Sequence, residues 1–375
     1  MTDLTRLWHF NRPKLAASLV DRALAQERVA LFGPRQTGKT SLLREEVMPL
    51  ATQRGALAIY IECWADKTDP LGSINYGLQK ALDDLTVPRP GAARTLKAPV
   101  KKVGFAGASV EIAEPARRAL PPSKFLQVDA LLSSILQETA KPLLLIFDEF
   151  QEAARTAEAD AAMAALRAAL TQASGRVGVI FSGSSEVLLL QAFSRAKAPL
   201  YGFAQAQAYP LLKEDFCGHV ARKFRQATTR DLPLVEAMRV MEQVGYQPGP
   251  FLRVVSSTMA NPRWTLDQSM QALLDPQAQT PWSVGWFSLT DLQRVALRLI
   301  AEEEQPTGKT SLERAARELG EPQVQPSSIT RALEALEKNG HIERNLMGGG
   351  KRYAVADPVM KAWLKVNKDL KITGI

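Results

Sequence analysis

The sequence contains little cysteine. Cys63 and Cys217 are the only two cysteines among 375 residues, and they lie far apart in the chain. Neither has the spacing of a metal-ligand or redox motif, and a disulfide-stabilised scaffold uses many more. This pattern predicts two free, buried thiols in a reducing compartment.

Long hydrophobic runs are absent as well. Apolar stretches such as residues 143–147 are far shorter than the ~20 residues that a membrane-spanning helix needs. Residues 1–10 lack the apolar run of a secretory signal peptide. We therefore expect a cytoplasmic protein with no membrane partner. The chain also has no internal repeat and no low-complexity tract.

The remaining composition is that of an ordinary soluble globular protein. Hydrophobic residues make up 46% of the chain and charged residues 23%. A length of 375 residues is enough for two or three domains with a substantial core.

Residues 33–40 fill every fixed position of the phosphate-binding motif G-x-x-x-x-G-K-[ST]. Gly33 and Gly38 can take backbone angles closed to other residues, so that consecutive N–H groups turn toward phosphate oxygens. Lys39 would reach the β- and γ-phosphates, and the Thr40 hydroxyl would ligate Mg²⁺. An apolar run at 28–32 indicates a strand before the motif, and a helix beginning at Thr40 would point its N-terminal dipole at the anion.

The motif therefore predicts ATP and Mg²⁺ as cofactors. The nucleotide-binding residues that we expect are Gly33, Pro34, Arg35, Gln36, Thr37, Gly38, Lys39, Thr40 and Ser41.

A second motif follows the apolar run 143–147, which ends in the acids Asp148 and Glu149. A carboxylate at the carboxyl end of a parallel strand lies in the crevice where ligands bind. We expect Asp148 to hold Mg²⁺, together with Thr40, and to neutralise charge with Lys39 during phosphoryl transfer. We expect Glu149 to be the general base that orients and polarises the attacking water, a role worth ~10²–10⁴-fold in rate.

A third apolar strand, 177–181, leads to Ser182. At the tip of this strand the serine would be a catalytic sensor that hydrogen-bonds the γ-phosphate or the water, or it is an ordinary serine at a strand end. Arg155 and Arg195 are candidates for an arginine that acts on the nucleotide of a neighbouring subunit. An exposed structural arginine is the alternative for both.

Apolar strands alternate with helical periodicity between residues 28 and 181, which predicts an α/β fold with a parallel sheet covered on both faces. The β pattern ends near Pro210, where short helices take over, and residues 275–281 look like a linker. We therefore divide the chain into a P-loop ATPase core (1–208), a helical lid subdomain (209–281) and a C-terminal winged-helix domain (282–375).

Within the core, residues 88–124 form a basic insertion. This segment contains eight basic and two acidic residues, so it holds most of the net charge of +8 that the whole chain carries. Prolines and two β-prone runs on either side of Gly107 predict a hairpin on proline-rich arms. The insertion would meet an anionic partner, or it is a solvated loop that is basic by accident. The candidate nucleic-acid-binding residues are Lys97, Lys101, Lys102, Arg117 and Arg118.

The winged-helix prediction comes from three helical segments near 289–303, 311–319 and 327–340, followed by two short runs around a glycine-rich turn at 348–350. In such a fold Ser328 and Arg331 would face the major groove of double-stranded DNA, and Lys351 and Arg352 would touch the backbone from the wing. Three glutamates offset these cations, and a winged helix can also bind protein, so both partners remain open.

Together these motifs resemble the archaeal-type ATPases, which belong to the STAND branch of P-loop NTPases close to AAA+ proteins. The resemblance rests on the loop 33–40, the acid pair within 147–150, the strand ending at 182–184 and the segment Pro199–Gly202. It spans roughly residues 10–260 and continues into the winged-helix tail. It implies an additional-strand (ASCE) core with a catalytic glutamate, a helical lid and nucleotide-dependent homo-oligomers.

Two further positions follow from the resemblance. Residues 245–253 look like the lid turn, and Arg253 falls where a second sensor for the nucleotide would lie. The family usually has arginine after the glycine of its Leu-Tyr-Gly motif, and this chain has Phe203. This departure from the family pattern argues against an activity that depends on an arginine at that point.

These patterns predict a Mg²⁺-dependent ATP hydrolase that acts as a nucleotide-controlled oligomeric switch associated with DNA, as in regulators of DNA remodelling or transposition. The alternative is a STAND-type signalling or defence scaffold whose winged helix binds protein rather than DNA. A nucleotide kinase would use the same loop, but the sequence shows no obvious acceptor site.

Overall fold

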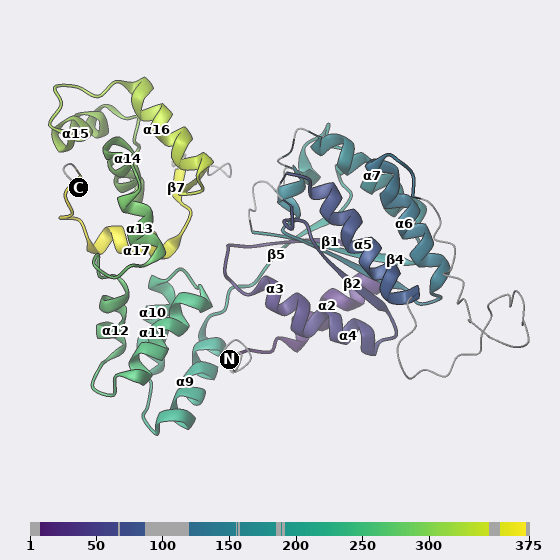
Figure 1. Ribbon diagram of the computed structural model, residues 1–375. Helices are drawn as coiled ribbons and strands as arrows, with labels where there is room; N and C mark the ends of the chain where they lie inside the picture. The colour runs from purple at the N-terminus through teal and green to yellow at the C-terminus, as the bar shows by residue number, and fades with distance from the viewer. Residues whose placement is uncertain are drawn as a thin grey trace, which may run out of the picture. The chain divides into compact units, whose positions relative to one another are not determined.

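The computed structural model describes residues 8–66, 68–86, 120–154, 156, 158–184, 189, 192–344 and 353–372. The chain forms two compact units, drawn in Figure 1. The α/β unit contains Asn11–Pro34 and Lys39–Tyr209, and the helical unit contains the described residues among 1–10, 35–38 and 210–375.

The two cysteines are both buried and free, as the sequence predicts. Within the described ranges, none of the helices has the length and apolar character needed to cross a membrane.

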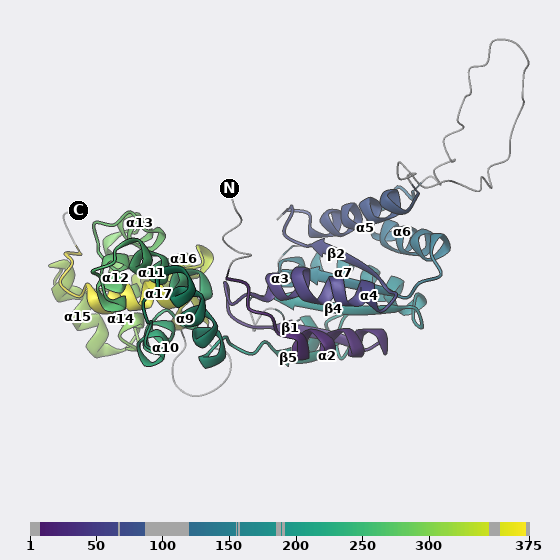
Figure 2. The same cartoon turned by 90° about the horizontal axis from the view of Figure 1, so that it is seen from below.

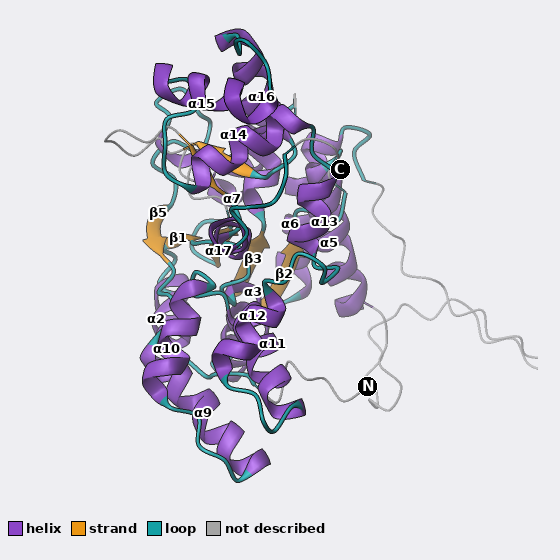
Figure 3. Cartoon of the chain, turned by 90° about the vertical axis from the view of Figure 1, so that its left-hand side faces the viewer, coloured by secondary structure: helices purple, strands orange, loops and turns teal. Residues whose placement is uncertain are grey.

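A five-stranded parallel sheet forms the centre of the α/β unit. Its strands are β1 (Arg28–Phe32), β2 (Leu57–Glu62), β3 (Leu143–Asp148), β4 (Val177–Gly183) and β5 (Gln205–Ala208). Their order is β2-β3-β4-β1-β5, and Figure 3 shows β5, β1, β3 and β2 in this sequence from left to right. The additional strand, β4, therefore lies between the strand before the phosphate loop and the strand that ends in the acid pair.

Helices cover both faces of the sheet (Figure 1). On one face lie α5 (Pro70–Thr86), α6 (Lys124–Glu138) and α7 (Ala159–Gln172), and on the other α2 (Pro13–Leu24), α3 (Lys39–Leu42) and α4 (Met48–Gln53). Successive residues of β3 alternate between these two apolar layers. Because β3 is buried on both faces, its residues 143–147 form a continuous apolar run in the sequence.

The helix after the phosphate loop is not regular. A π-helical turn, Leu43–Val47, separates α3 from α4, and the Met48 N–H bonds the Leu43 carbonyl five residues back. Pro49 lies in the first turn of α4. Proline has no N–H and clashes with the carbonyl four residues before it, so a wider turn at this point relieves a conflict that the sequence creates.

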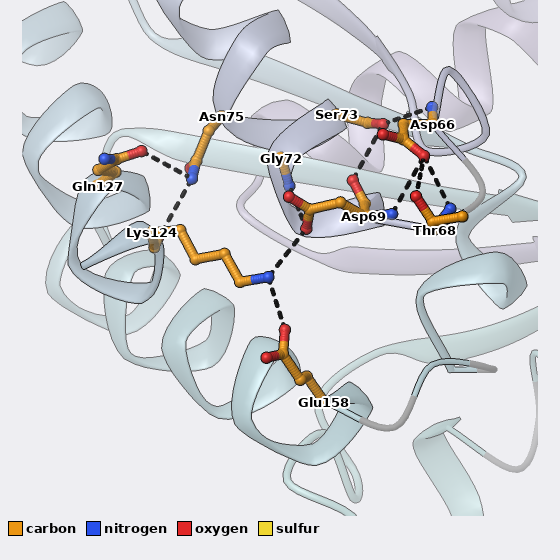
Figure 4. Close-up of polar contacts among 9 residues, drawn as sticks. All are labelled: Asp66, Thr68, Asp69, Gly72, Ser73, Asn75, Lys124, Gln127 and Glu158. Carbon is orange, nitrogen blue, oxygen red and sulfur yellow. Dashed lines mark hydrogen bonds and ion pairs between the residues drawn. The ribbon is translucent and has the colours of Figure 1, made fainter. Parts of the chain in front are cut away.

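Lys124 fastens the beginning of α6 to two other elements (Figure 4). Its Nζ lies 3.2 Å from Asp69 Oδ1, before α5, and 2.6 Å from Glu158 Oε2, before α7. Asn75 Nδ2 of α5 donates to the Lys124 carbonyl at 2.9 Å. The N-terminal ends of α5 and α6 are therefore side by side. The predicted basic hairpin lies in residues 87–119, outside the described residues.

Strand β5 was not predicted from the sequence. Its residues, Gln-Ala-Gln-Ala, are mostly exposed. Pairing with β1 fixes the strand, and Arg22 of α2 donates to the side chains of Gln205 and Gln207 at 2.9 and 2.5 Å. An edge strand held by backbone pairing and polar side chains carries no apolar signal.

The helical unit contains one apolar core. Its elements are α9 (Glu214–Thr228), α10 (Leu234–Gln243), α11 (Pro248–Ala260), α12 (Leu266–Leu273), α13 (Pro281–Phe287), α14 (Asp291–Ala301), α15 (Lys309–Leu319), α16 (Pro326–Lys338), β6 (Ile342–Arg344), β7 (Tyr353–Val355) and α17 (Pro358–Val366). Figure 3 shows the predominance of helix. Residues 209–281 and 282–375, which the sequence divides, pack together: a Cβ on Gly245 would lie 2.2 Å from that of Pro358.

The C-terminal part has the elements expected for a winged helix, although that assignment stays a prediction. Helices α14, α15 and α16 precede the antiparallel pair β6–β7. Arg294 of α14 is buried and donates to the carbonyls of Trp286, Phe287 and Ile372. The helix α17, which has no counterpart in the sequence analysis, buries Trp363 completely.

Gly178 marks the closest approach of a helix to the sheet. A Cβ at this position of β4 would lie 1.9 Å from the backbone carbonyl oxygen of Ala23 in α2. Because a backbone atom cannot rotate away, we expect Gly178→Ala to lower the free energy of unfolding by about 3 kcal/mol. Urea denaturation followed by circular dichroism measures the change. Gly249→Ala is the control, because nothing lies within 4 Å of its Cβ position; equal stability of the two variants would contradict the prediction.

Candidate functional site

The site lies where three neighbouring strands end. Strands β3, β4 and β1 are parallel and adjacent, so their carboxyl ends meet at one edge of the sheet. β1 runs into residues 33–40, β3 ends at Asp148 and β4 ends at Gly183. The topology therefore brings the two sequence motifs to the same edge.

Two residues of the phosphate loop have left-handed backbone angles. Gly38 has φ +93° as its motif position requires, and Gln36 has φ +59°. The conformation of Gln36 is uncommon for a residue with a side chain and is typical of functional loops. Gly33 has no such angle; a Cβ there would lie 3.0 Å from Cβ of Tyr209, so packing rather than conformational freedom requires this glycine.

The loop presents a partly exposed surface. Pro34, Arg35, Gln36, Thr40 and Ser41 are exposed, whereas Thr37 is fully buried. Lys39 is 5% exposed, and its Nζ lies 2.7 Å from the carbonyl oxygens of both Gly33 and Pro34. The ammonium is thus folded back over the loop that is expected to hold the phosphates.

Asp148 is the centre of the site. It is 2% exposed, and a buried carboxylate needs hydrogen-bond donors. Thr40 Oγ1 donates to its Oδ2 at 2.7 Å and Tyr60 Oη donates to the same oxygen at 2.5 Å. Ser182 Oγ donates to Oδ1, which also accepts the Glu149 N–H at 3.1 Å. Three strands and the helix after the loop therefore meet at one side chain.

These residues fit a magnesium ion. Mg²⁺ prefers hard oxygen ligands and is usually bound by one or two protein oxygens, waters and phosphates. The Thr40 hydroxyl and the Asp148 carboxylate are such ligands, and their contact brings the two predicted metal residues together. No cluster of three or more His, Cys, Asp or Glu side chains suited to a metal occurs in the described ranges.

Tyr60 is a site residue that the sequence analysis missed. Burial, then the charge of Asp148 and the hydrogen bond to it, raise the pKa of Tyr60 well above its ordinary value. The Arg44 guanidinium lies over its ring, 4.1 Å from the centroid. Burial also raises the pKa of Cys63, beside Asp148, so this thiol stays protonated. The parallel register sets this neighbourhood, since it pairs Glu62 of β2 with Asp148 of β3.

Glu149 leaves the strand through a left-handed turn, with φ +53°. Its Oε2 accepts hydrogen bonds from Gln151 Nε2 at 2.5 Å and from Ser184 Oγ at 2.8 Å. Neither donor is among the site residues predicted from the sequence. The sequence feature that could have indicated them is that polar residues follow both β3 and β4, the two apolar strands that end at the site.

The structure gives the other predicted catalytic residues distinct surroundings. Ser182 is fully buried and directed at Asp148; its role as a sensor of the γ-phosphate stays a prediction. Arg195 is exposed and lies 3.0 Å from Asp160 Oδ1, while Arg155 is outside the described residues. Phe203, where the family usually has arginine, is buried beneath the guanidinium groups of Arg28 and Arg167.

Residues predicted to act outside this edge stay predictions. Arg253 lies on α11 of the helical unit, and Ser328 and Arg331 lie on α16, where Arg331 is exposed. Seven of the nine candidate DNA-binding residues lie outside the described residues: Lys97, Lys101, Lys102, Arg117, Arg118, Lys351 and Arg352.

Comparison with known proteins agrees with this geometry. Residues 14–182 match the family model of an AAA ATPase domain, a range that contains the loop, Asp148, Glu149 and Ser182. No match was found among the curated proteins.

Two solved structures share the architecture over nearly the whole chain. The Walker-type ATPase paby2304 of Pyrococcus abyssi has 17% identity and a TM-score of 0.58, covering 96% of this chain and 99% of that one. The ORC2 protein of Aeropyrum pernix, solved as ADPNP–ADP complexes, has 15% identity and a TM-score of 0.52, covering 97% and 98%. At such identities the likeness concerns the fold.

The chain therefore has the fold of an AAA+-like P-loop NTPase, with the strand order and the loop described above. Its region 14–182 is similar to the AAA ATPase domain.

Lys39 gives the first test of the site. In Lys39→Ala the ammonium is lost from the loop, and we expect affinity for ATP to fall by at least about 100-fold, since charge-assisted contacts to phosphate are strong. Titration with a fluorescent ATP analogue measures the change. Lys80→Ala, an exposed lysine on α5, is the control and should bind like the wild type. Unchanged affinity of Lys39→Ala would contradict the assignment of the loop.

Proposed function

We propose that this protein is a Mg²⁺-dependent ATPase that acts as a nucleotide-controlled oligomeric switch associated with DNA. The observation that carries the ATPase assignment is that Thr40, which follows Lys39 in the phosphate loop, and Glu149 both donate hydrogen bonds to Asp148. A phosphate loop alone binds nucleotide, whereas an adjoining metal-binding carboxylate and a second acid supply what hydrolysis needs.

The roles of the residues follow from their chemistry. The loop N–H groups and Lys39 would bind the phosphates, while Thr40 and Asp148 would hold Mg²⁺. The ion supplies neutralising charge on the phosphate oxygens when it is bound. Glu149 would accept a proton from the attacking water, whose oxygen bonds to the γ-phosphorus as the bond to the ADP oxygen breaks. Ser182 would hold Asp148 or sense the γ-phosphate.

The structural relatives are consistent with this proposal. The P. abyssi protein is called a Walker-type ATPase, and the A. pernix protein was solved with ADPNP and ADP. ATP is accordingly the nucleotide that we propose for this chain. Homo-oligomers, with Arg195 or Arg155 acting on a neighbouring nucleotide and Arg253 as a second sensor, form part of the same proposal.

Association with DNA rests on charge and on the C-terminal elements. The segment 88–124 concentrates basic residues, and Arg331 is exposed on α16, the helix that precedes the β6–β7 pair. Phosphate contacts by such residues provide sequence-independent affinity. Hydrolysis would then switch an oligomer between states that bind duplex DNA differently.

One observation favours the alternative, a signalling or defence scaffold whose C-terminal module binds protein. Arg344 of β6 is paired with Glu337 of α16, at 2.9 Å between Nε and Oε2. This pair neutralises a cation close to the predicted DNA-binding surface. DNA binding therefore decides between the two candidates.

Glu149→Gln tests the hydrolytic mechanism. The amide cannot accept the proton of water, so we expect kcat to fall by about 10²–10⁴-fold while ATP still binds. Release of phosphate and binding of a fluorescent ATP analogue are the two measurements. Glu158→Gln, an exposed glutamate before α7, is the matched control. Normal turnover by Glu149→Gln would reject the assignment of this residue.

Salt dependence of duplex binding tests the association with DNA. We expect wild-type affinity to fall steeply with salt, and the double variant Lys101→Gln/Lys102→Gln to flatten the log–log slope by about 2. Lys80→Gln/Lys141→Gln removes the same charge at two exposed sites and is the control. Equal effects of both pairs would show a mere charge effect, and absence of wild-type binding would favour the protein-binding scaffold.

A further inference from the structure

Two donors hold Glu149 by one of its oxygens. Gln151 Nε2 and Ser184 Oγ lie 2.5 and 2.8 Å from Oε2. No hydrogen bond to Oε1 is formed within the described part of the chain. The carboxylate is therefore anchored through one oxygen, and the second remains available to a water.

Gln151 is unusual for a buried residue. Its side chain has no solvent exposure, and its Oε1 has no hydrogen-bond partner among the described residues. Its Nε2, by contrast, faces only acceptors: Glu149 Oε2, Ser184 Oγ at 3.3 Å and Glu152 Oε1 at 3.4 Å. A buried amide with an unpaired oxygen lowers stability, so packing alone does not account for it.

The surrounding structure fixes this amide in place. Phe150, between Glu149 and Gln151, is fully buried, with its ring 4.6 Å from Phe181 and 5.9 Å from Phe193. The Glu152 N–H bonds the Glu149 carbonyl at 3.0 Å and closes the turn. The aromatic cluster thus holds the left-handed conformation of Glu149 and directs the next side chain toward the site.

Gly183 makes room for the amide from the other side. A Cβ at Gly183 would lie 2.5 Å from Gln151 Oε1 and 3.2 Å from Leu189 Cδ2. Gly183 has no positive φ that would exclude alanine. The absence of a side chain at Gly183 therefore leaves space for the Gln151 amide, and a methyl group there would displace the end of the Gln151 side chain.

We propose that Gln151 and Ser184 are positioning residues for hydrolysis. They hold Glu149 Oε2, so that Oε1 faces the water and accepts its proton. This inference rests on the proposed role of Glu149 as the general base. The proton moves from the water to Oε1 as the water oxygen attacks, and the two donors keep their own protons throughout.

Gln151→Leu and Ser184→Ala test the proposal. We expect each to lower kcat by about 10–100-fold, because hydrogen bonds to a charged group are stronger than neutral ones, and to leave ATP affinity within about twofold. Ser184→Thr, which keeps the hydroxyl, should retain most of the rate. Gln79→Leu is the matched control, because Gln79 Nε2 donates to Asp83 Oδ1 at 2.9 Å on α5.

A second set of variants separates positioning from folding. If the amide acts through Glu149, Gln151→Leu added to Glu149→Gln should cause no further loss of kcat. Gly183→Ala should lower kcat as Gln151→Leu does, with thermal unfolding close to that of the wild type. Should Gln151→Leu fail to fold, Gly183→Ala and Ser184→Ala decide.

The outcomes are distinct. Wild-type or faster hydrolysis by Ser184→Ala and Gly183→Ala, or an additive loss in the double variant, would overturn the positioning role while Glu149→Gln remains inactive. Normal hydrolysis by Glu149→Gln would instead reject the proposed function itself.

Discussion

The buried carboxylate of Asp148 organises the site, and everything else there depends on it. A charge with so little exposure is tolerated only when donors surround it. The donors are the hydroxyls of Thr40, Tyr60 and Ser182 and the N–H of Glu149, and they belong to the helix after the loop, to β2, to β4 and to the turn after β3. One side chain thus fixes the spacing between the phosphate loop and the three strand ends. Its contact with Thr40 joins the two ligands expected for Mg²⁺.

A second layer of contacts sets the direction of Glu149. The strand order places β4 beside β3, so Ser184, just beyond the end of β4, can reach the turn that follows Asp148. That turn is held by Phe150, whose ring packs against the rings of Phe147, Phe181 and Phe193. Glycines define the limits of this packing: Gly178 lies against the α2 backbone, and Gly183 lies against Gln151. The polar side chains of the site lie on or just after strands β3 and β4, and every residue of these strands is buried. This packing holds the polar side chains in place.

Much of the α/β unit could be predicted because its strands are covered on both faces and appear as unbroken apolar runs. The edge strand β5 could not, because exposed Gln and Ala residues carry no such pattern. The interruption of the helix after the loop could be traced to Pro49 only once the turn was visible. In the helical unit, residues 275–281 look like a linker in the sequence, and one apolar core contains buried residues from both sides of them. The packing of helices that are distant in the chain cannot be predicted from the composition of the segment between them.

The phosphate loop, the acid pair and the parallel α/β class could be predicted from the amino-acid sequence, because each is a local pattern with a fixed spacing or period. The hydrogen bonds of Tyr60 to Asp148 and of Gln151 and Ser184 to Glu149 become evident only in the folded chain. The first contact follows from the register of β2 on β3, and the Ser184 contact from the neighbourhood of β4. Gln151 is close in sequence, but its direction depends on a left-handed residue and on a phenylalanine buried among rings from other elements. Hydrogen bonds between strand ends arise from the order of the sheet, which no single segment of the chain encodes.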